Sequence, residues 1–208
     1  MVLLLGATGL LGRNVLQVLL ERGIPVRALV RSYLDVPGVE VVRGSILSRD
    51  VLMKAADGCS AIINCAGTTD MVLPSVEDFL PVNRDLPAML CEVASHYGIK
   101  VLVHTSTANT IITGTSERPS DESAPFGPPY DKSLYAISKK AGEEALLGYA
   151  SAHPELRVVI VNPGFMLGAY DSKPSSGRMV LLGWKKPLVF VPLGAKSILH
   201  VRDAAKAM

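Results

Sequence analysis

The chain has 208 residues, of which 49% are hydrophobic and 19% are charged, and its mean hydropathy is +0.32. These values exclude a disordered chain and predict a globular protein of one large domain, or of one domain with a small appendage. The 21 Lys and Arg residues outnumber the 19 Asp and Glu residues by a net charge of only +2, and no stretch is strongly basic. Nucleic acid is therefore not an expected partner.

Cysteine and histidine usage argues against disulfides and metal sites. Cys59, Cys65 and Cys91 are odd in number and form no CxxC pair, and the four histidines have no metal-ligand spacing. The longest apolar run falls short of the roughly 20 residues of a membrane helix, and the first residues lack the basic start of a signal peptide. We therefore expect a soluble, cytoplasmic protein with reduced thiols, no metal and no membrane contact.

Apolar periodicity predicts alternating strands and helices up to residue 162. The predicted strands cover residues 2–5, 26–30, 39–42, 61–64, 101–103 and 158–161. The predicted helices cover residues 11–22, 48–56, 83–97 and 135–149. Such an alternation predicts right-handed βαβ crossovers, and therefore an α/β fold with a Rossmann-type, doubly wound parallel sheet and helices on both faces.

A glycine-rich turn joins the first predicted strand to the first predicted helix, with the sequence Gly6-Ala-Thr-Gly9-Leu-Leu-Gly12. At this position the spacing is typical of dinucleotide binding, because the glycines allow a tight turn, a close pyrophosphate and close packing of the helix. The helix N-terminus then offers N–H groups to the phosphates. The expected cofactor contacts here are Gly6, Thr8, Gly9, Leu10, Leu11 and Gly12. A βα turn that binds nothing is the alternative.

The end of the second predicted strand bears on the choice of dinucleotide. An acidic side chain at this place accepts hydrogen bonds from an adenosine 2′-hydroxyl, but this chain has Arg31 and Ser32. A guanidinium pairs with a 2′-phosphate, so the sequence favours NADP over NAD. Asp35 lies close enough to keep NAD open, and an ordinary solvated arginine is the other interpretation of Arg31.

Tyr135 and Lys139 are spaced i and i+4, on one face of a predicted helix. A free phenol has a pKa near 10, and a neighbouring cation lowers that pKa. We therefore expect Lys139 to lower the pKa of Tyr135, so that Tyr135 can exchange a proton with a substrate oxygen. Because this pair is common by chance, a plain surface Tyr and Lys are the alternative.

Hydroxyl side chains follow the fifth predicted strand in the run His104-Thr-Ser-Thr107. They reach the carboxyl edge of the sheet, where open α/β folds bind ligands. Ser106 or Thr107 could hold a substrate oxygen beside the phenol of Tyr135. A Ser/Thr turn with local backbone hydrogen bonds is the alternative.

Beyond residue 162 the pattern loosens. A short helix over 178–184, a strand over 198–201 and a helix over 203–208 are predicted, and Trp184 belongs either to a substrate lobe, to a subunit contact or to local core. We expect a dinucleotide-binding domain over 1–162. Residues 163–208 would begin an incomplete substrate-binding lobe, interleaved with the last strands.

Taken together and in this order, the glycine turn, the hydroxyl-bearing strand end and Tyr135-x-x-x-Lys139 resemble the extended short-chain dehydrogenases/reductases. Within them, the chain resembles the NAD-dependent epimerase/dehydratase group and its dihydroflavonol-reductase-like members. The segments that carry this likeness are VHTSTANT (103–110), NPGFMLG (162–168), DSKPSSG (171–177) and HVRDAA (200–205). The likeness covers essentially all 208 residues.

The resemblance implies a role for each catalytic candidate. Tyr135 would be the general acid/base, and Lys139 would bind the nicotinamide ribose and adjust Tyr135. Thr107 aligns best with the family's catalytic Ser/Thr, and Ser106 is the near alternative.

The resemblance also implies further cofactor and structural contacts. Asn64, Cys65, Ala66 and Gly67 would line the adenosine and ribose side, Asn83 would stabilise the central sheet, and Pro163 and Gly164 would place backbone against the nicotinamide carboxamide. The chain departs from the family pattern at Gly44-Ser45, where an acidic residue is usual, and at 64–67, where a histidine-led version is common. Family members also continue well beyond this length.

The expected function is an NAD(P)-dependent oxidoreductase that transfers hydride between NADPH and a small carbonyl or alcohol substrate. A nucleotide-sugar epimerase or dehydratase with tightly bound NAD is the first alternative, and a non-catalytic dinucleotide-binding protein is the second. Family resemblance also implies a homodimer through a helix bundle that could include residues 83–97 and 135–149.

Overall fold

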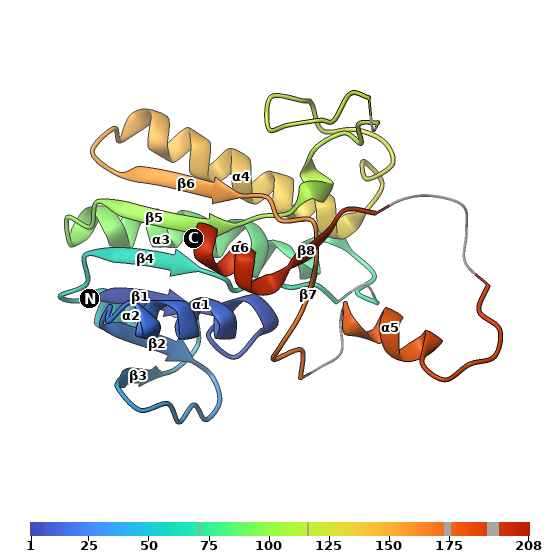
Figure 1. Cartoon of the computed structure of the whole chain (residues 1–208). Helices are drawn as coiled ribbons and strands as arrows, with labels where there is room; N and C mark the ends of the chain where they lie inside the picture. The colour runs from blue at the N-terminus through green and yellow to red at the C-terminus, as the bar shows by residue number, and fades with distance from the viewer. Residues whose placement is uncertain (71, 116, 173–175, 191–195) are drawn as a thin grey trace.

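The computed structural model describes residues 1–70, 72–115, 117–172, 176–190 and 196–208. A six-stranded sheet with the order β3-β2-β1-β4-β5-β6 forms its centre (Figure 1). Its strands are β1 Val2–Leu5, β2 Val26–Val30, β3 Val39–Arg43, β4 Ala61–Asn64, β5 Val101–Thr105 and β6 Arg157–Val161. All neighbouring pairs run parallel, so the predicted doubly wound parallel sheet is confirmed.

Helices cover both faces of the sheet. The helices α1 Leu10–Glu21 and α6 Val201–Ala207 lie on one face, and α2 Arg49–Ala56, α3 Leu86–His96 and α4 Leu134–Ala152 lie on the other. β1 shows why its run of leucines is needed: Leu4 packs into the core beneath α1, whereas Leu3 and Leu5 pack into the opposite core. Alternate residues of a strand point to opposite faces, so a strand covered on both sides must be apolar throughout.

The strand order reverses between β1 and β4. From β1 the chain first adds β2 and β3 on one side, and then β4, β5 and β6 on the other. The loops that leave the carboxyl ends of β1 and β4 therefore diverge, which is the place where open α/β sheets bind ligands.

The predicted helix over 83–97 has a different start in the structure. Residues Pro81–Asp85 form a π-helical turn, η2, and the α-helix proper begins at Leu86. Pro87 has no N–H to donate to the carbonyl of Asn83, so a regular α-helical bond is missing there. The free side of this carbonyl faces α4 at Gly142, where a Cβ would lie only 2.0 Å from the Asn83 oxygen.

The C-terminal part differs most from the prediction. β7 Phe165–Leu167, which was not predicted, pairs with β8 Ile198–His200 in a separate two-stranded sheet. The predicted strand 198–201 is one residue shorter, and α6 begins at Val201 instead of 203, because the His200 side chain accepts the Arg202 N–H and caps the helix.

Helix α5, Gly177–Gly183, lies apart from the central sheet (Figure 1). Its apolar side chains are exposed, including Met179, Leu181 and Leu182, and Trp184 just after it is 65% exposed. Trp184 is therefore not a local core residue. Over the residues that the structure describes, no helix has the length and apolarity to cross a membrane.

Candidate active site

The glycine turn after β1 is closed by its own backbone. Gly6 has φ +79°, which favours glycine, and its carbonyl accepts the Gly9 N–H at 3.0 Å. A Cβ on Gly12 would lie 2.0 Å from the Gly6 oxygen, so only glycine lets α1 start this close to the strand. The spacing read in the sequence thus corresponds to real steric requirements at Gly6 and Gly12.

The N-terminus of α1 is open toward the crevice. Gly9 caps the helix without a side-chain hydrogen bond, and the first turn has no acidic residue. The early N–H groups of a helix lack intrahelical acceptors and attract anions. Thr8 is exposed at this turn, while the Leu11 side chain packs into the core and leaves only its backbone for a ligand. These features fit the pyrophosphate of a dinucleotide.

The loop after β4 lies directly against the glycine turn. A Cβ on Gly6 would approach the Cys65 carbonyl carbon to 2.6 Å. At the loop's other end, a Cβ on Gly67 would lie 3.8 Å from the Lys139 Nζ. Residues 64–67 therefore run from the turn to Lys139, as expected for a loop that borders a dinucleotide. The Asn64 side chain is fully buried and accepts the Ala66 N–H at 3.0 Å, so Asn64 shapes the loop from beneath.

Asn83 holds the next part of this loop in place. Its Oδ1 accepts the Thr68 N–H at 2.9 Å, and its Nδ2 donates to the Thr68 carbonyl at 3.0 Å and to the Ser138 hydroxyl at 2.9 Å. The family resemblance implied that Asn83 would stabilise the central sheet. The structure corrects this: Asn83 joins the β4 loop to α4, because η2 lies between them.

Tyr135 and Thr107 meet at the carboxyl edge of β5. The Thr107 hydroxyl forms a hydrogen bond with the Tyr135 phenol, and both groups come from predicted site residues. Burial raises the pKa of Tyr135, and the hydrogen bond with Thr107 lowers it by less, so the pKa stays above its usual value. The expectation that Lys139 lowers this pKa is wrong for this arrangement, because the lysine amine is directed elsewhere.

Lys139 is buried one turn after Tyr135 on α4, with 3% of its surface exposed. Its Nζ donates to the Thr105 carbonyl at 2.5 Å and lies 3.4 Å from His104 Nε2. Burial lowers the pKa of Lys139 to about 8, although Glu143 and Cys65 act in the opposite direction. The same burial raises the pKa of the Cys65 thiol to about 12.

Ser106 and Thr107 have different surroundings, although they are adjacent. The Ser106 hydroxyl donates to Glu143 Oε1 at 2.5 Å, and the same oxygen accepts from Thr110 at 2.7 Å and from Asn162 at 2.7 Å. Glu143 is buried, and Ser106 helps to satisfy its carboxylate. Of the two candidates, only Thr107 is therefore beside Tyr135.

Pro163 and Gly164 follow β6 next to the same corner. The Pro163 carbonyl accepts the Ala108 N–H at 3.0 Å, and Asn162 donates to the Thr107 carbonyl at 3.2 Å. The backbone of this segment therefore lies against the loop that carries Thr107. The family resemblance implied that Pro163 and Gly164 would contact the nicotinamide.

Arg31 is exposed at the end of β2 and has no ion-pair partner among the described residues. Nearby, the Arg43 guanidinium lies 5.5 Å from the centre of the Tyr33 ring, and Tyr33 forms a hydrogen bond with Asp35. Asp35 is therefore engaged with Tyr33, while the Arg31 guanidinium remains available for an anionic group.

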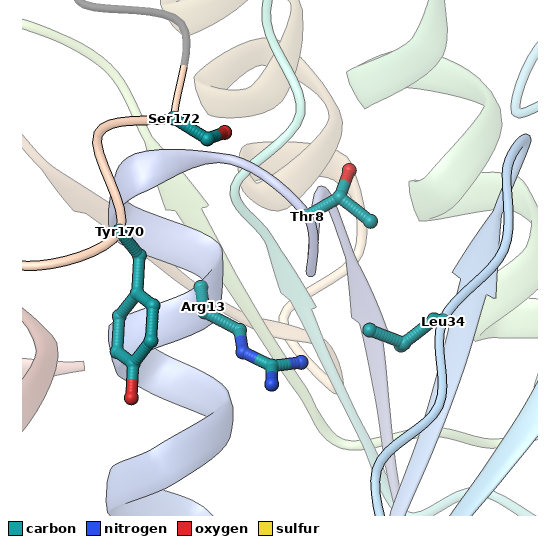
Figure 2. Close-up of a pocket in the computed structure, with 5 residues that line it drawn as sticks. All are labelled: Thr8, Arg13, Leu34, Tyr170 and Ser172. Atoms are coloured by element: carbon teal, nitrogen blue, oxygen red, sulfur yellow. The ribbon is translucent and has the colours of Figure 1, made fainter.

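A pocket of about 200 Å³ opens beside the glycine turn (Figure 2). It is lined by Thr8, Arg13, Leu34, Tyr170 and Ser172. Only Thr8 was expected from the sequence. Arg13 directly follows the glycine turn but belongs to no motif, whereas the other lining residues come from two distant segments, 34 and 170–172. The buried amide of Asn14 in α1 donates to the Ala169 carbonyl at 2.9 Å and so holds the second of these segments near the turn. In the motif 171–177, residues 173–175 lie outside the described residues.

The chain is similar to known proteins both in sequence and in structure. The chain is 30% identical to sterol demethylase protein B of Methylococcus capsulatus over 210 residues, which cover 97% of this chain and 62% of that protein. It is 29% identical over 209 residues to a putative dihydroflavonol 4-reductase of Synechocystis, covering 96% and 59%. The structure of the UDP-glucose 4-epimerase of Thermus thermophilus in complex with NAD superposes with a TM-score of 0.83 at 24% identity, covering 99% of this chain and 72% of that one.

The chain spans about half to three fifths of the length of the curated relatives it matches. The Synechocystis relative confirms the predicted resemblance to dihydroflavonol-reductase-like proteins, and the epimerase structure shares the Rossmann-type fold. The family model described as the NAD dependent epimerase/dehydratase family matches residues 2–208. Because that match covers nearly the whole chain, the protein belongs to the NAD dependent epimerase/dehydratase family.

Proposed function

We propose that this chain is the dinucleotide-binding and catalytic part of an oxidoreductase that reduces a small-molecule carbonyl with NADPH, or oxidises the alcohol in reverse. The observation that carries the proposal is the pairing of the Thr107 and Tyr135 hydroxyls, with Lys139 one turn further along α4. The glycine turn reaches the same edge of the sheet through the loop 64–67.

Each residue has a distinct task in this proposal. A bound nicotinamide dinucleotide supplies or accepts the hydride. Thr107 and Tyr135 hold the substrate oxygen between their hydroxyls, and Tyr135 gives its proton to that oxygen in the reduction. Burial raises the pKa of Tyr135 above its usual value, so the phenol holds its proton at neutral pH until the substrate oxygen takes it up. Lys139 is buried near the path of the ribose, where its amine can donate to a sugar hydroxyl.

Arg31 supports NADP as the preferred cofactor. Its guanidinium is exposed at the end of β2, and a phosphate there would gain a charge-assisted, bidentate partner. Replacement of Arg31 by Ala is expected to weaken NADPH binding about tenfold and to leave NADH binding nearly unchanged. Isothermal titration with both cofactors measures this, and Arg22→Ala, an exposed arginine after α1, is the control. Equal losses for NADPH and NADH would remove the 2′-phosphate role.

A nucleotide-sugar epimerase or dehydratase with retained NAD is the second candidate, since the same catalytic residues serve both reactions. Asp35, which interacts with Tyr33 shortly after β2, is the residue that favours NAD. Mass spectrometry of the dinucleotide released from purified, denatured protein separates the two. Exchangeable NADPH with turnover of carbonyl compounds supports the reductase, and tightly retained NAD supports the epimerase. NADPH binding without turnover on a broad carbonyl panel would contradict the reductase and support a non-catalytic dinucleotide-binding protein.

The family resemblance also leads us to propose a homodimer through α3 and α4. Leu147 on α4 is 57% exposed and offers apolar surface for such a contact. Sedimentation equilibrium is expected to give twice the chain mass, and a monomer at high protein concentration would refute the dimer.

A further inference from the structure

Glu143 is a buried carboxylate on α4, two helical turns after Tyr135. Its Oε1 accepts hydrogen bonds from three side chains of other segments: Ser106 at 2.5 Å, Thr110 at 2.7 Å and Asn162 at 2.7 Å. A buried carboxylate is costly unless such donors satisfy it. The proposed reaction gives this group no task, although its donors come from the segments that meet at the catalytic corner.

Two of these donors also reach the backbone carbonyl of Thr107. Thr110 Oγ1 lies 2.8 Å from this carbonyl oxygen, and Asn162 Nδ2 lies 3.2 Å from it. The Thr110 hydroxyl has one proton and serves one acceptor at a time, whereas the Asn162 amide has two protons. Asn162 therefore links the Glu143 carboxylate to the Thr107 carbonyl, whichever way the Thr110 hydroxyl turns.

The backbone of Thr107 determines where its hydroxyl lies. Thr107 is extended, with φ −159° and ψ 147°, and caps the short 3₁₀ helix η3, Ala108–Thr110. Its Oγ1 accepts the Asn109 N–H at 3.3 Å, which leaves the hydroxyl proton for a partner at the corner, where Tyr135 lies. A rotation of this backbone would carry the hydroxyl away from the phenol.

The pairing with β6 holds the neighbours of Thr107. The Ser106 N–H donates to the Val161 carbonyl at 2.8 Å, and the Ala108 N–H donates to the Pro163 carbonyl at 3.0 Å. The Thr107 carbonyl itself is held by the Thr110 N–H at 3.2 Å and by the side chains that Glu143 gathers. Glu143 therefore acts on the one residue of this stretch whose hydroxyl meets the phenol.

We propose that Glu143 is a positioning residue that holds Thr107 against Tyr135 through Asn162 and Thr110. Helix α4 would then carry the phenol directly and hold its hydroxyl partner through the carboxylate, so that both move with the helix. The importance of this arrangement for turnover rests on the proposed function, but the arrangement itself does not.

Glu143 has a second influence that the experiment must separate. Its charge raises the pKa of Lys139, and its Oε2 pairs with Lys140 at 3.2 Å. Glu143→Ala removes both the charge and the acceptor, whereas Glu143→Gln removes the charge and keeps an acceptor oxygen. We expect Glu143→Ala to lower kcat about tenfold, because a small misplacement of a reacting group is costly. Glu143→Gln should remain within about threefold of wild type.

The matched control is Glu144→Ala, an exposed glutamate on the same helix. It should leave kcat within about twofold of wild type. A Glu143→Gln variant as impaired as Glu143→Ala would mean that the charge matters and not the hydrogen bonds, and would refute the positioning role.

A double-mutant cycle with Thr107→Ala shows whether Glu143 acts through Thr107. Residues that act through one another are not additive. In the Thr107→Ala background, Glu143→Ala should therefore lower kcat by less than about twofold. NADPH affinity should stay nearly constant in all four proteins, which a general loss of structure would not allow. Multiplied losses in the double variant would overturn the proposal.

Crystal structures of the variants test the arrangement without any turnover. The Thr107 Oγ1 and the Tyr135 phenol should lie within hydrogen-bonding distance in wild type and beyond it in Glu143→Ala. Asn162→Leu, which removes the bridging donor at similar size, should separate them too and serves where Glu143→Ala does not fold. An unchanged distance in either folded variant would refute the role of Glu143. The proposed reductase would stand or fall separately, on the Tyr135→Phe test described below.

Discussion

The two sides of the proposed ligand-binding crevice are built by different means. The glycine turn is built from backbone: its shape depends on the missing side chains of Gly6 and Gly12, and its donors are the N–H groups at the start of α1. The proposed catalytic corner is built from side chains, with Thr107 after β5 and Tyr135 and Lys139 on α4. An added methyl group should therefore disrupt the glycine turn. The corner formed by Thr107, Tyr135 and Lys139 should instead be sensitive to the loss of a functional group.

The largest effect is expected from Tyr135→Phe, which removes one hydroxyl from the catalytic corner. Turnover of a carbonyl substrate should fall about a thousandfold, because general acid catalysis by a positioned group contributes on this order. Dinucleotide affinity should change little, since the glycine turn is untouched. Steady-state kinetics and isothermal titration measure the two quantities.

Tyr149→Phe is the matched control for that change. Tyr149 is on the same helix, and its hydroxyl donates to Ser95 at 2.9 Å, away from the corner. Its loss should leave turnover within about twofold of wild type, as for a change that touches no reacting group. Equal losses in the two variants would mean that α4 as a whole is sensitive and that Tyr135 has no special role.

On the backbone side, Gly12→Ala adds a methyl group that would lie 2.0 Å from the Gly6 oxygen. We expect unfolding free energy to fall by about 3 kcal/mol and dinucleotide binding to be lost, because the turn must open. Gly148→Ala, in α4 with nothing within 4 Å of its Cβ position, should instead gain about 0.5–1 kcal/mol. Urea unfolding measures both changes. A Gly12→Ala variant as stable as wild type would show that the glycine turn does not depend on the missing side chain of Gly12.

Thr107→Ala and Ser106→Ala separate chemistry from packing within the catalytic corner. Thr107→Ala should lower turnover about tenfold to a hundredfold with little loss of stability, because it removes a hydrogen bond to Tyr135. Ser106→Ala should lower stability by about 1–3 kcal/mol, because buried Glu143 loses a donor. Kinetics and thermal unfolding of both variants check the assignment, which the reverse pattern would overturn.

The smallest predicted effect concerns acid stability. The His104 pKa is lowered on folding, so the unfolded chain binds more protons below its usual pKa of 6.5, and stability is lost as pH falls through that value. The loss should reach about 1 kcal/mol per pH unit, and His104→Phe should remove this part of the slope. The glycine turn carries no titratable side chain and therefore adds nothing to the pH dependence of stability. Urea unfolding of both proteins above and below pH 6.5 measures this loss. The same pH dependence of the unfolding free energy in wild type and His104→Phe would contradict the prediction.

Much of the fold could be predicted because it depends on local patterns. Short, mainly apolar runs marked the six strands of the central sheet, because a strand covered on both faces has few polar positions. The short strand β7 was missed because three residues give too little periodicity, and its partner β8 is more than 30 residues away. The π-helical turn before α3 was missed because it depends on Pro87 and on packing against α4.

The candidate site was readable where one segment carries the signal, as in the glycine turn and in Tyr135 with Lys139. The residues alone left Ser106 and Thr107 both open, and only the family resemblance favoured Thr107. The structure separates them because neighbouring residues of an extended chain point to opposite sides, and the buried Glu143 that binds Ser106 lies far away in sequence. The prediction that Lys139 lowers the pKa of Tyr135 was wrong for a similar reason. Spacing puts both residues on one helix face, but only the surroundings reveal that the amine turns to Thr105 and His104.

The contact between Gly142 and the Asn83 carbonyl has a consequence for evolution and engineering. Gly142 is the spacer that sets how near α4 comes to η2. Even one methyl group at Gly142 would shift helix α4, which carries Tyr135 and Lys139. Gly142 itself lies two helical turns from Tyr135. Mutant libraries confined to the crevice lining would never sample this position, although it sets how far Tyr135 and Lys139 extend toward the crevice.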